Sequence, residues 1–471
     1  MAAPARTPKS FDRAIVDGPI ARAVWRLAWP TMLQNVIGGL QGIIDHAMVG
    51  QFVGYTGNAA IGVAFQIFLV VIVFLSSLFT GMSVLVARYA GAGDSETVGR
   101  TVYQAFLASM ALCLGVLAPI GWMLSPALLR LINAAPAVQA EALPYLRIMF
   151  VFSAGMLLFF MFGAALRSAG DARTPLRLAL VMTGLNVVLN IVFIRGLGPI
   201  PAFGTAGAAM GTVVAGAITS GIAIYLLVSG RLVVTWPRGM PRRPDLGIVR
   251  ALFRFGLPTG VQGIAMNVGG VLLLRFIGSL ERSAQAQAVY AVGYSELFSL
   301  ITWTSVGLMG AAAAVAGQNL GAGRPERSVA GVHVAAGIGL GVATVVGALF
   351  LTIPGRLLGL FGMDEPGVVA LGTQLLAFLS VSGLFVTVAL TYTGGLQGTG
   401  DTRSPLYITL LAQLIVPLGL CFVLDRSVGL EPHHIWTAIL LGHATRCVLS
   451  VLRFRQGKWR GIRVEIEPAR G

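Results

Sequence analysis

Charged side chains are scarce in this chain. Lys, Arg, Asp and Glu together make up 11% of its 471 residues, whereas hydrophobic residues make up 56% and the mean hydropathy is +0.82. Because soluble domains carry about 25% charged residues, this composition excludes a soluble globular protein. The apolar residues gather in runs of about 20 or more, which is the length that spans a bilayer as a helix. The sequence therefore predicts an all-α integral membrane protein.

Cysteine and the common catalytic motifs are nearly or wholly missing. Cys113, Cys421 and Cys447 all lie in apolar runs without a CxxC pair, which excludes a disulfide framework and a cysteine-based metal site. We find no Walker A loop, no GxSxG in a strand context and no HExxH. We therefore expect no enzyme, no metal and no cofactor. Active transport by such a chain has to draw on an ion gradient.

Acidic residues are the rarer charge type, with 18 Asp and Glu against 33 Lys and Arg, and the net charge is +15. Of the 33 basic residues, 26 lie in the termini and around the even-numbered loops, and seven lie around the odd-numbered loops. This bias predicts a multi-pass protein of the bacterial inner membrane with both termini cytoplasmic. Topology and the lipid bilayer explain the basicity, so we expect no nucleic-acid partner. We also expect a monomer.

The chain repeats itself at an offset of about 230 residues. Residues 165–176 read ALRSAGDARTPL, and residues 395–406 read GLQGTGDTRSPL. WRLAWPT at 25–31 returns as FRFGLPT at 253–259. Matches at nearly one offset and in the same order indicate an internal duplication. In a membrane chain, duplication is typical of two halves that move against each other around a central site.

Each half is predicted to contain six membrane spans, so both halves enter from the same side and the repeat is parallel. The spans are predicted at residues 26–50, 59–87, 101–125, 143–166, 175–194, 203–228, 251–278, 285–314, 329–353, 368–395, 405–424 and 434–452. The predicted organisation is a cytoplasmic N-terminal segment (1–24), a first lobe (25–228), a cytoplasmic linker (229–250), a second lobe (251–453) and a basic cytoplasmic tail (454–471).

The repeated turn, GDARTP in one half and GDTRSP in the other, has a physical explanation. Gly170 and Gly400 suit the positive φ that ends a helix. Asp171 and Asp401 suit hydrogen bonds to nearby backbone donors. We expect a structural cytoplasmic turn, and a gating role for its Asp and Arg charges is the alternative.

Asp45 is the main candidate for a functional side chain. It is one of two acids inside the predicted spans, and an acid in the bilayer is costly and functional by default. Gln34, Gln41 and Asp45 are spaced by seven and four residues, which places them on one helical face. Burial favours the protonated form of a carboxylic acid, so Asp45 could accept a proton, or its carboxylate could help to ligate Na⁺. A helix cap or a bond to a neighbour is the structural alternative.

Asn186 and Asn190 form a polar stripe in the fifth span, with Thr183 three residues before. Amide groups offer a carbonyl oxygen to a cation and an NH₂ group to a carboxylate. Thr205 and Thr212, near the start of the sixth span, could add a hydroxyl group. Ordinary hydrogen bonding between membrane helices is the alternative.

Three further features allow more than one interpretation. Glu296, the second embedded acid, could form a structural ion pair with Arg275, or act in proton transfer or in binding a cationic substrate. Pro30 and Pro258 each remove a backbone donor early in the first helix of a half and bend it, either as a static kink or as a moving part. His46 either packs at the membrane interface or senses pH.

Several motifs, in order, resemble one known family. They are IDHAMVG (44–50), RSAGDARTP (167–175), LNVVLNIVFI (185–194) followed by GTAGAAMGT (204–212), and GQNLGAGR (317–324). Together they resemble the multidrug and toxic compound extrusion (MATE) family, closest to its prokaryotic DinF-like branch, over about 25–452. The resemblance implies a cation-coupled exporter of twelve transmembrane helices in two pseudo-symmetric six-helix lobes that form a V.

The resemblance also implies roles for individual residues. The acid of the first span, here Asp45, faces two positions of the fifth span, here Asn186 and Asn190, and the second of these is often Asp in the family. One branch carries acids in the seventh and tenth spans, where this chain has Met266 and Val386. Coupling is therefore expected in the first lobe, and the first helix is expected to bend when its acid is protonated.

We therefore predict a secondary active multidrug efflux antiporter. It would export small amphipathic, cationic compounds in exchange for H⁺ or Na⁺ by alternating access. H⁺ is favoured because one buried carboxylate suffices for protons, whereas Na⁺ at Asp45, Asn186 and Asn190 is the alternative. A flippase for a lipid-linked precursor is the alternative function, disfavoured because the spans contain almost no basic residue at mid-depth. A channel, which would conduct without exchange, or a membrane enzyme, which would need a catalytic constellation, is a remote alternative.

Overall fold

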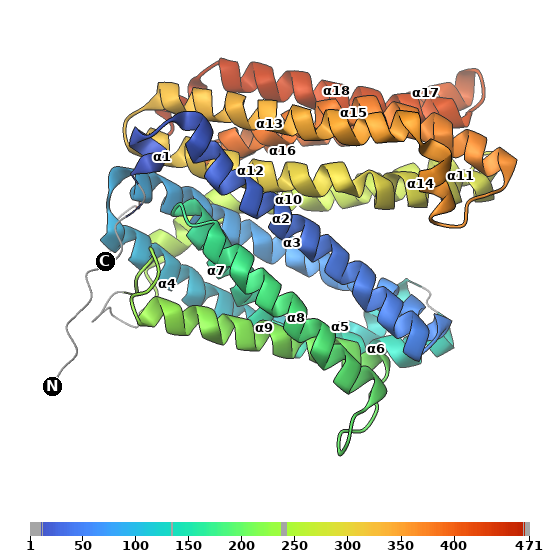
Figure 1. The fold of residues 1–471 in the computed structure, drawn as a ribbon, viewed down its shortest axis with the longest axis horizontal. Coiled ribbons are helices and arrows are strands. Elements are labelled where there is room, and N and C mark those ends of the chain that lie inside the picture. Colours follow the sequence, from blue (N-terminus) through green and yellow to red (C-terminus); the bar gives the residue numbers. More distant parts are fainter. Residues whose placement is uncertain (1–10, 12, 133–134, 237–242, 465, 467–471) are drawn as a thin grey trace. The chain divides into compact units, whose positions relative to one another are not determined.

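The computed structural model describes residues 11, 13–132, 135–236, 243–464 and 466, which form helices joined by short turns (Figure 1). The β pairing in these residues is limited to an isolated bridge between Leu197 and Ile200. The helices are α1 (Ala14–Asp17), α2 (Ile20–Phe52), α3 (Tyr55–Ala92), α4 (Ser95–Leu112), η1 (Cys113–Leu117), α5 (Ala118–Leu131), α6 (Pro136–Phe152), α7 (Ala154–Ser168), α8 (Arg173–Arg195), α9 (Thr205–Val228), α10 (Leu246–Gly278), α11 (Ser283–Tyr290), η2 (Ala291–Leu297), α12 (Ser299–Gly321), α13 (Pro325–Thr352), α14 (Pro354–Gly359), α15 (Pro366–Gly398), α16 (Arg403–Thr409), η3 (Leu410–Ile415), α17 (Val416–Ser427), α18 (Pro432–Arg455) and η4 (Lys458–Gly461). The predicted all-α class is confirmed.

The long helices account for all twelve predicted spans. Ten described helical segments are long and apolar enough to cross a membrane. α6 and α7 pass the same test together and are bent by 52° between them. α2 has 33 residues and is not among the helices that pass this test; it contains three glutamines and one embedded acid. Helices suit this setting because they satisfy every backbone polar group internally, and the chain is a multi-pass membrane protein.

The described chain folds into two compact units, and it passes between them inside two helices. The first unit holds Val36–Gly260, together with Arg13 and Val464, and the second holds Ala14–Asn35 and Val261–Arg463. The division therefore falls inside α2 and α10 and not in the predicted linker, of which residues 237–242 lie outside the described part. Parts of the predicted N-terminal segment and of the predicted tail lie outside it too. The units differ from the predicted lobes by the first halves of these two helices.

Small residues bring the first half of α10 against α3 in the first unit. A Cβ atom at Gly256 would lie 2.1 Å from the carbonyl oxygen of Ser77, and one at Gly81 would lie 2.0 Å from that of Leu252. Only glycine permits backbones to approach this closely, which is how membrane helices gain packing energy without a hydrophobic driving force. These glycines therefore fix residues 246–260 in the first unit.

The first half of α2 makes an equivalent contact with α12 in the second unit. A Cβ atom at Gly307 would lie 2.6 Å from the Cα atom of Met32. Thr31 Oγ1 donates to the Gly307 carbonyl oxygen at 2.9 Å. Thr31 directly follows Pro30, which has no backbone N–H to donate. The Thr31 hydroxyl group therefore adds a hydrogen-bond donor next to the position where the backbone lacks one. The same unit also contains α13, α15 and α18, which run alongside one another (Figure 1).

The repeated turn has the same geometry in both units, as the sequence predicts. Gly170 and Gly400 have φ angles of 100° and 99°. Asp171 accepts from the backbone N–H of Thr174 at 3.0 Å and from its hydroxyl at 2.6 Å. Asp401 accepts from the backbone N–H of Ser404 at 3.1 Å and from its hydroxyl at 2.9 Å. The turn is a capped helix start that the duplication has preserved.

Asp401 makes an additional contact that Asp171 does not share among the described residues. Arg453, near the end of α18, donates to Asp401 through Nε at 2.9 Å and through its terminal nitrogen at 2.8 Å. This ion pair ties the turn before α16 to the last long helix of the second unit.

Three spans contain a stretch of π-helix. η1 interrupts the third span, η2 the eighth and η3 the eleventh. A π-helical turn inserts an extra residue, rotates the side chains that follow it, and often marks a functional site. The second unit holds two of the three, η2 and η3.

Candidate functional site

The site in the first unit is built around a contact between α2 and α8. Asn190 Nδ2 donates to Asp45 Oδ1 at 2.7 Å. Asn190 is fully buried, and Asp45 is partly buried. The short distance is typical of a hydrogen bond to a charged acceptor. The structure therefore brings together the acid of the first span and the second asparagine of the fifth span.

The site extends from α8 to α9 through the other asparagine. Asn186, also fully buried, donates from Nδ2 to Thr212 Oγ1 at 3.1 Å, and its Oδ1 accepts from Asn190 Nδ2 at 3.4 Å. Asn190 Oδ1 has no hydrogen-bond partner among the described residues. It lies so close to Gly211 that a Cβ atom there would be 2.0 Å away. The polar cluster thus fits against a glycine of α9.

A second contact between α2 and α8 lies one helical turn before the first. Thr183 Oγ1 donates to Gln41 Oε1 at 3.0 Å. Since Gln41 and Asp45 are four residues apart, as are Asn186 and Asn190, the two helices face each other along polar stripes. The predicted residues Asp45, Asn190, Asn186 and Thr212 therefore form one connected set of hydrogen bonds, and Gln41 and Thr183 form a separate pair on the same two helices.

Two predicted accessory residues lie elsewhere. Thr205 donates from Oγ1 to Glu141 Oε2 at 2.7 Å and not to an asparagine. Glu141, in α6, is an acid that the sequence analysis missed because the predicted span began at residue 143. Gln34 lies in the part of α2 that belongs to the second unit. It is therefore not placed with Gln41, although the two share a helical face.

The structure does not bring Glu296 and Arg275 together. Both side chains are exposed, and no ion pair joins them in the described part of the chain. Glu296 lies in η2, where the π-helical turn changes the direction of side chains relative to a regular helix. The predicted structural ion pair is therefore not found.

The remaining predicted features are placed as follows. Pro30 and Pro258 lie inside α2 and α10, and each helix continues unbroken through its proline. The His46 ring Nδ1 is hydrogen-bonded to Asn58 Oδ1 of α3. This bond engages His46 within the first unit. Met266 and Val386 lie in α10 and α15 of the second unit.

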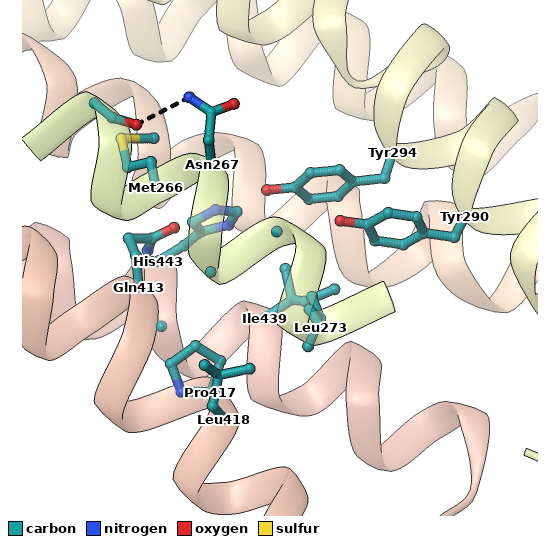
Figure 2. Close-up of a pocket in the computed structure, with 14 residues that line it drawn as sticks. Met266, Asn267, Leu273, Tyr290, Tyr294, Gln413, Pro417, Leu418, Ile439 and His443 are labelled. Carbon is teal, nitrogen blue, oxygen red and sulfur yellow. Dashed lines mark hydrogen bonds between the residues drawn. The ribbon is translucent and has the colours of Figure 1, made fainter. Parts of the chain in front are cut away.

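The second unit contains a cavity of about 350 Å³ (Figure 2). α10, α11, η2, η3, α17 and α18 line it, and its polar lining residues include Asn267, Tyr290, Tyr294, Gln413 and His443. No pattern in the sequence predicted this cavity.

Arg446, one helical turn beyond His443, does not lie where the charge count predicted. The charge count assigned it to the cytoplasmic side, but its side chain is only 2% exposed inside α18. The prediction that the spans contain almost no basic residue at mid-depth was therefore wrong at this position. Its position between residues 434 and 452, inside a predicted span, was the available signal.

Comparison with known proteins agrees with this fold. The family model MatE matches residues 30–192 and 258–423, once in each half of the chain. A probable multidrug resistance protein NorM of Deinococcus radiodurans is 29% identical over 448 residues, covering 92% of this chain and 94% of that protein. A probable multidrug resistance protein NorM of Thermotoga maritima is 26% identical over 441 residues, covering 93% of each. The multidrug resistance protein MdtK of Pectobacterium atrosepticum is 25% identical over 450 residues, covering 92% and 95%.

Solved structures share the fold over nearly the whole chain. One is described as an outward-facing conformation of a multidrug resistance MATE family transporter of the MOP superfamily, with a TM-score of 0.87 and 22% identity, covering 97% of this chain and 100% of that one. A MATE structure in the straight conformation gives the same values. The duplicated helical fold and the buried polar cluster define a polytopic membrane transporter. The chain belongs to the MatE family.

Proposed function

We propose that this transporter exports multiple drugs and exchanges them for protons bound at Asp45. The observation that carries the proposal is the 2.7 Å hydrogen bond from Asn190 to Asp45. It couples the titratable group of α2 to α8, and through Asn186 and Thr212 to α9. A change in the charge of Asp45 is therefore felt by three helices of one unit.

The orientation of the amides favours protons over sodium. Asn190 turns its NH₂ group toward Asp45, and its carbonyl oxygen faces Gly211. Sodium, like other hard cations, needs several oxygen ligands directed at one point, so Asn190 would have to turn over to supply one beside Asp45. A proton needs only the carboxylate itself. The alternative is that Asp45, Asn186 and Asn190 bind Na⁺, and evidence for it would replace the proton in this proposal.

Protonation supplies the differential affinity that exchange requires. The ionised carboxylate of Asp45 is a stronger acceptor for Asn190 than the neutral acid, because charge-assisted hydrogen bonds are about twice as strong. Loss of the charge therefore weakens the link between α2 and α8. If one access state contains the link and the other does not, protons favour the second state and substrate favours the first.

The names of the relatives support multiple drugs as substrates. Proteins called multidrug resistance proteins match this chain over more than nine-tenths of its length. A net charge of +15, placed mainly toward one side of the membrane, does not select for anionic cargo by itself. We therefore propose small amphipathic, cationic compounds as the exported class.

Transport by purified protein in sealed liposomes tests the proposal. We expect an imposed pH gradient, without sodium, to drive the exchange of a cationic dye such as ethidium. Asp45→Asn should fold normally, because the amide keeps the oxygen that accepts from Asn190, but should lose the driven exchange at least about tenfold. Glu141→Gln is the matched control, because Glu141 is another acid of the same unit outside the polar cluster.

Two results would contradict the proposal. If a sodium gradient at fixed pH drives exchange and a pH gradient does not, the coupling ion is Na⁺. If Asp45→Asn retains proton-driven exchange at normal protein level, Asp45 is not the coupling residue.

A further inference from the structure

A buried polar stripe runs along one face of α18 in the second unit. Trp436, His443, Arg446 and Ser450 are spaced by seven, three and four residues, which places them on the same helical face. All four side chains are at most 3% exposed. In each, one buried polar atom lacks a hydrogen-bond partner in the described part of the structure: Trp436 Nε1, His443 Nδ1, Arg446 Nε and Ser450 Oγ. Most buried polar groups in proteins are paired, so four unpaired groups on one face need an explanation.

Arg446 is the most costly member of the stripe. It lies 14 residues after the start of α18 and nine before its end, which is about 21 Å and about 14 Å along the helix axis. A guanidinium group stays protonated in proteins, and an unpaired charge inside a membrane is expensive. The position therefore calls for an anionic partner.

The acids of the second unit that form ion pairs do so with other bases. Asp401 pairs with Arg453, and Glu326 pairs with Arg460. Asp17 pairs with Arg324. No acid pairs with Arg446 among the residues that the structure describes. The missing partner is thus not a described side chain of this unit.

One member of the stripe, His443, reaches the cavity, and other hydrogen-bond donors line the cavity beside it. His443 lines the cavity directly, and Arg446 is close enough to Tyr294 and His443 to interact with both electrostatically. Figure 2 shows the rings of Tyr290 and Tyr294 side by side, with both hydroxyl groups directed toward Asn267 and His443. Neither hydroxyl group has a hydrogen-bond partner within the described residues. These donors suit an acceptor that carries negative charge.

The walls of the cavity suit a flat ring. Tyr290 and Tyr294 stack with ring centroids 4.9 Å apart at 8°, and Tyr294 lies parallel to His443 at 6.4 Å and 9°. The opposite wall is apolar and includes Leu273, Pro417, Leu418 and Ile439. A mostly apolar pocket with a few convergent polar groups is typical of a small-molecule site, and about 350 Å³ falls within the usual range.

The fold does not require this arrangement. The equivalent helix of the first unit, α9, contains no charged residue between Thr205 and Val228. Two π-helical segments contribute to the cavity, Tyr294 from η2 and Gln413 from η3. π-Helical turns inside α-helices are frequent at functional sites. The duplicated architecture is therefore compatible with an apolar helix here, and the second unit has departed from it.

We propose that this cavity is a binding site for a small aromatic carboxylate. The carboxylate group accepts from His443 and the tyrosine hydroxyl groups, and its charge balances that of Arg446. The aromatic ring lies between the tyrosine rings and the apolar wall. This site is separate from the Asp45 cluster, so the proposal does not depend on the coupling ion or on the exported compound.

Calorimetric titration of the full-length protein in lipid nanodiscs tests the site without any ion gradient. The probes are 2-naphthoate and its neutral isostere 2-naphthamide. We expect 2-naphthoate to bind one site per chain and at least about tenfold more tightly than 2-naphthamide. Arg446→Gln should weaken 2-naphthoate binding at least about tenfold and abolish the difference between the probes, because the charge is lost.

A second variant tests the cavity without touching Arg446. Gly270 lines the cavity, and a Cβ atom there meets nothing within 4 Å, so Gly270→Phe should fill the space and abolish binding of 2-naphthoate. Gly337→Phe is the matched control, because Gly337 is an equally open helix glycine outside the cavity, and it should bind like the natural chain. Thermal unfolding of each variant checks folding.

The outcomes decide the proposal in either direction. If the natural chain does not bind 2-naphthoate, or binds the amide equally well, the anion site is refuted. Unchanged affinity in folded Arg446→Gln or in Gly270→Phe also refutes it. If Arg446→Gln fails to fold, Arg446→Lys, which keeps the charge, should retain the preference for 2-naphthoate, and loss of that preference in the folded lysine variant counts against the site.

Discussion

Asp45 in α2 accepts a 2.7 Å hydrogen bond from Asn190 in α8, and the carbonyl oxygen of the same asparagine lies against Gly211 in α9. One amide group therefore contacts both neighbouring helices. Its orientation is set on one side by a carboxylate and on the other by the absence of a side chain. Variants at either side should disturb the same hydrogen bond.

Gly211→Ala should impair coupling without touching any polar residue. The new methyl group would lie 2.0 Å from Asn190 Oδ1, so the amide has to move and its bond to Asp45 is lost. We expect proton-driven exchange to fall at least about tenfold, measured in proteoliposomes. Gly221→Ala, on the same helix in open space, should leave exchange unchanged. Equal exchange in the two variants would show that this bond is not needed.

Thr212→Val and Thr205→Val distinguish the role of the polar cluster around Asp45 from that of the neighbouring contact with Glu141. Both changes keep side-chain volume and remove one buried hydroxyl group, with an expected loss of about 0.5–2 kcal/mol in stability. Thr212 accepts from Asn186, whereas Thr205 donates to Glu141. Only Thr212→Val should raise the apparent affinity for protons, read from the pH dependence of exchange, because a less firmly held Asn190 stabilises the ionised carboxylate of Asp45 less. The opposite pattern would place Glu141 in the coupling site.

Gly307→Val should destabilise the protein through overpacking. Its Cβ would lie 2.6 Å from the backbone of Met32, and such strain costs about 1–3 kcal/mol. Gly310→Val, on the same helix but with nothing within 4 Å, should be tolerated. Thermal unfolding in detergent measures both. A tolerated Gly307 variant would mean that the first half of α2 is not held tightly in the second unit.

Glu296→Gln should leave stability unchanged. Its side chain is exposed and makes no ion pair with Arg275 in the described part of the chain, so no structural contact is lost. Arg275→Gln should be equally neutral. A measured loss of thermal stability in both variants would indicate the ion pair that the sequence suggested. If exchange of a cationic dye falls while stability holds, Glu296 acts on the substrate.

Cysteine labelling tests the orientation in the membrane. The positive-inside bias predicts that residues 55, 135 and 364 face the periplasm and that tags at 240 and 471, outside the described residues, face the cytoplasm. Tyr55→Cys is preferable to a cysteine at Gly54, whose φ of 100° disfavours any side chain. An impermeant maleimide should label Tyr55→Cys, Ala135→Cys and Asp364→Cys in intact cells. External access to the tag at 240 would reverse the assignment.

The sequence was sufficient for the features that depend on local patterns. Apolar runs predicted the spans, and the repeated GDARTP and GDTRSP turns predicted the duplication. Residue spacings predicted a polar face on the first span and another on the fifth, and the family resemblance implied that these faces bring Asp45, Asn186 and Asn190 together. Thr212 was predicted only as one of two equivalent candidates. Nothing in the spacing of Thr205 and Thr212 distinguishes which hydroxyl group reaches Asn186.

The features that the sequence could not give depend on distant contacts. Glu141 fell two residues outside a predicted span because helix ends in a membrane are not marked by composition alone. Arg446 was grouped with the basic residues after it, although the packing of α18 in the second unit buries it. The π-helical turns η2 and η3 have no sequence signature, and they decide which residues of their spans face the cavity.

The chain passes from one unit to the other inside α2 and inside α10. Each unit can therefore be completed only after a segment from the other half of the sequence has been made. Synthesis starts at the N-terminus, so residues 20–35 are made long before α12 of the second unit, which packs against Thr31 and Met32. Residues 246–260 are made only after the six spans of the first half, yet Gly81 and Ser77 of the first unit pack against them. The first half therefore leaves the ribosome with its own packing incomplete and with a segment that belongs to a unit not yet made. Each half of the sequence therefore lacks one segment of the compact unit that it mainly forms and carries one segment of the other unit.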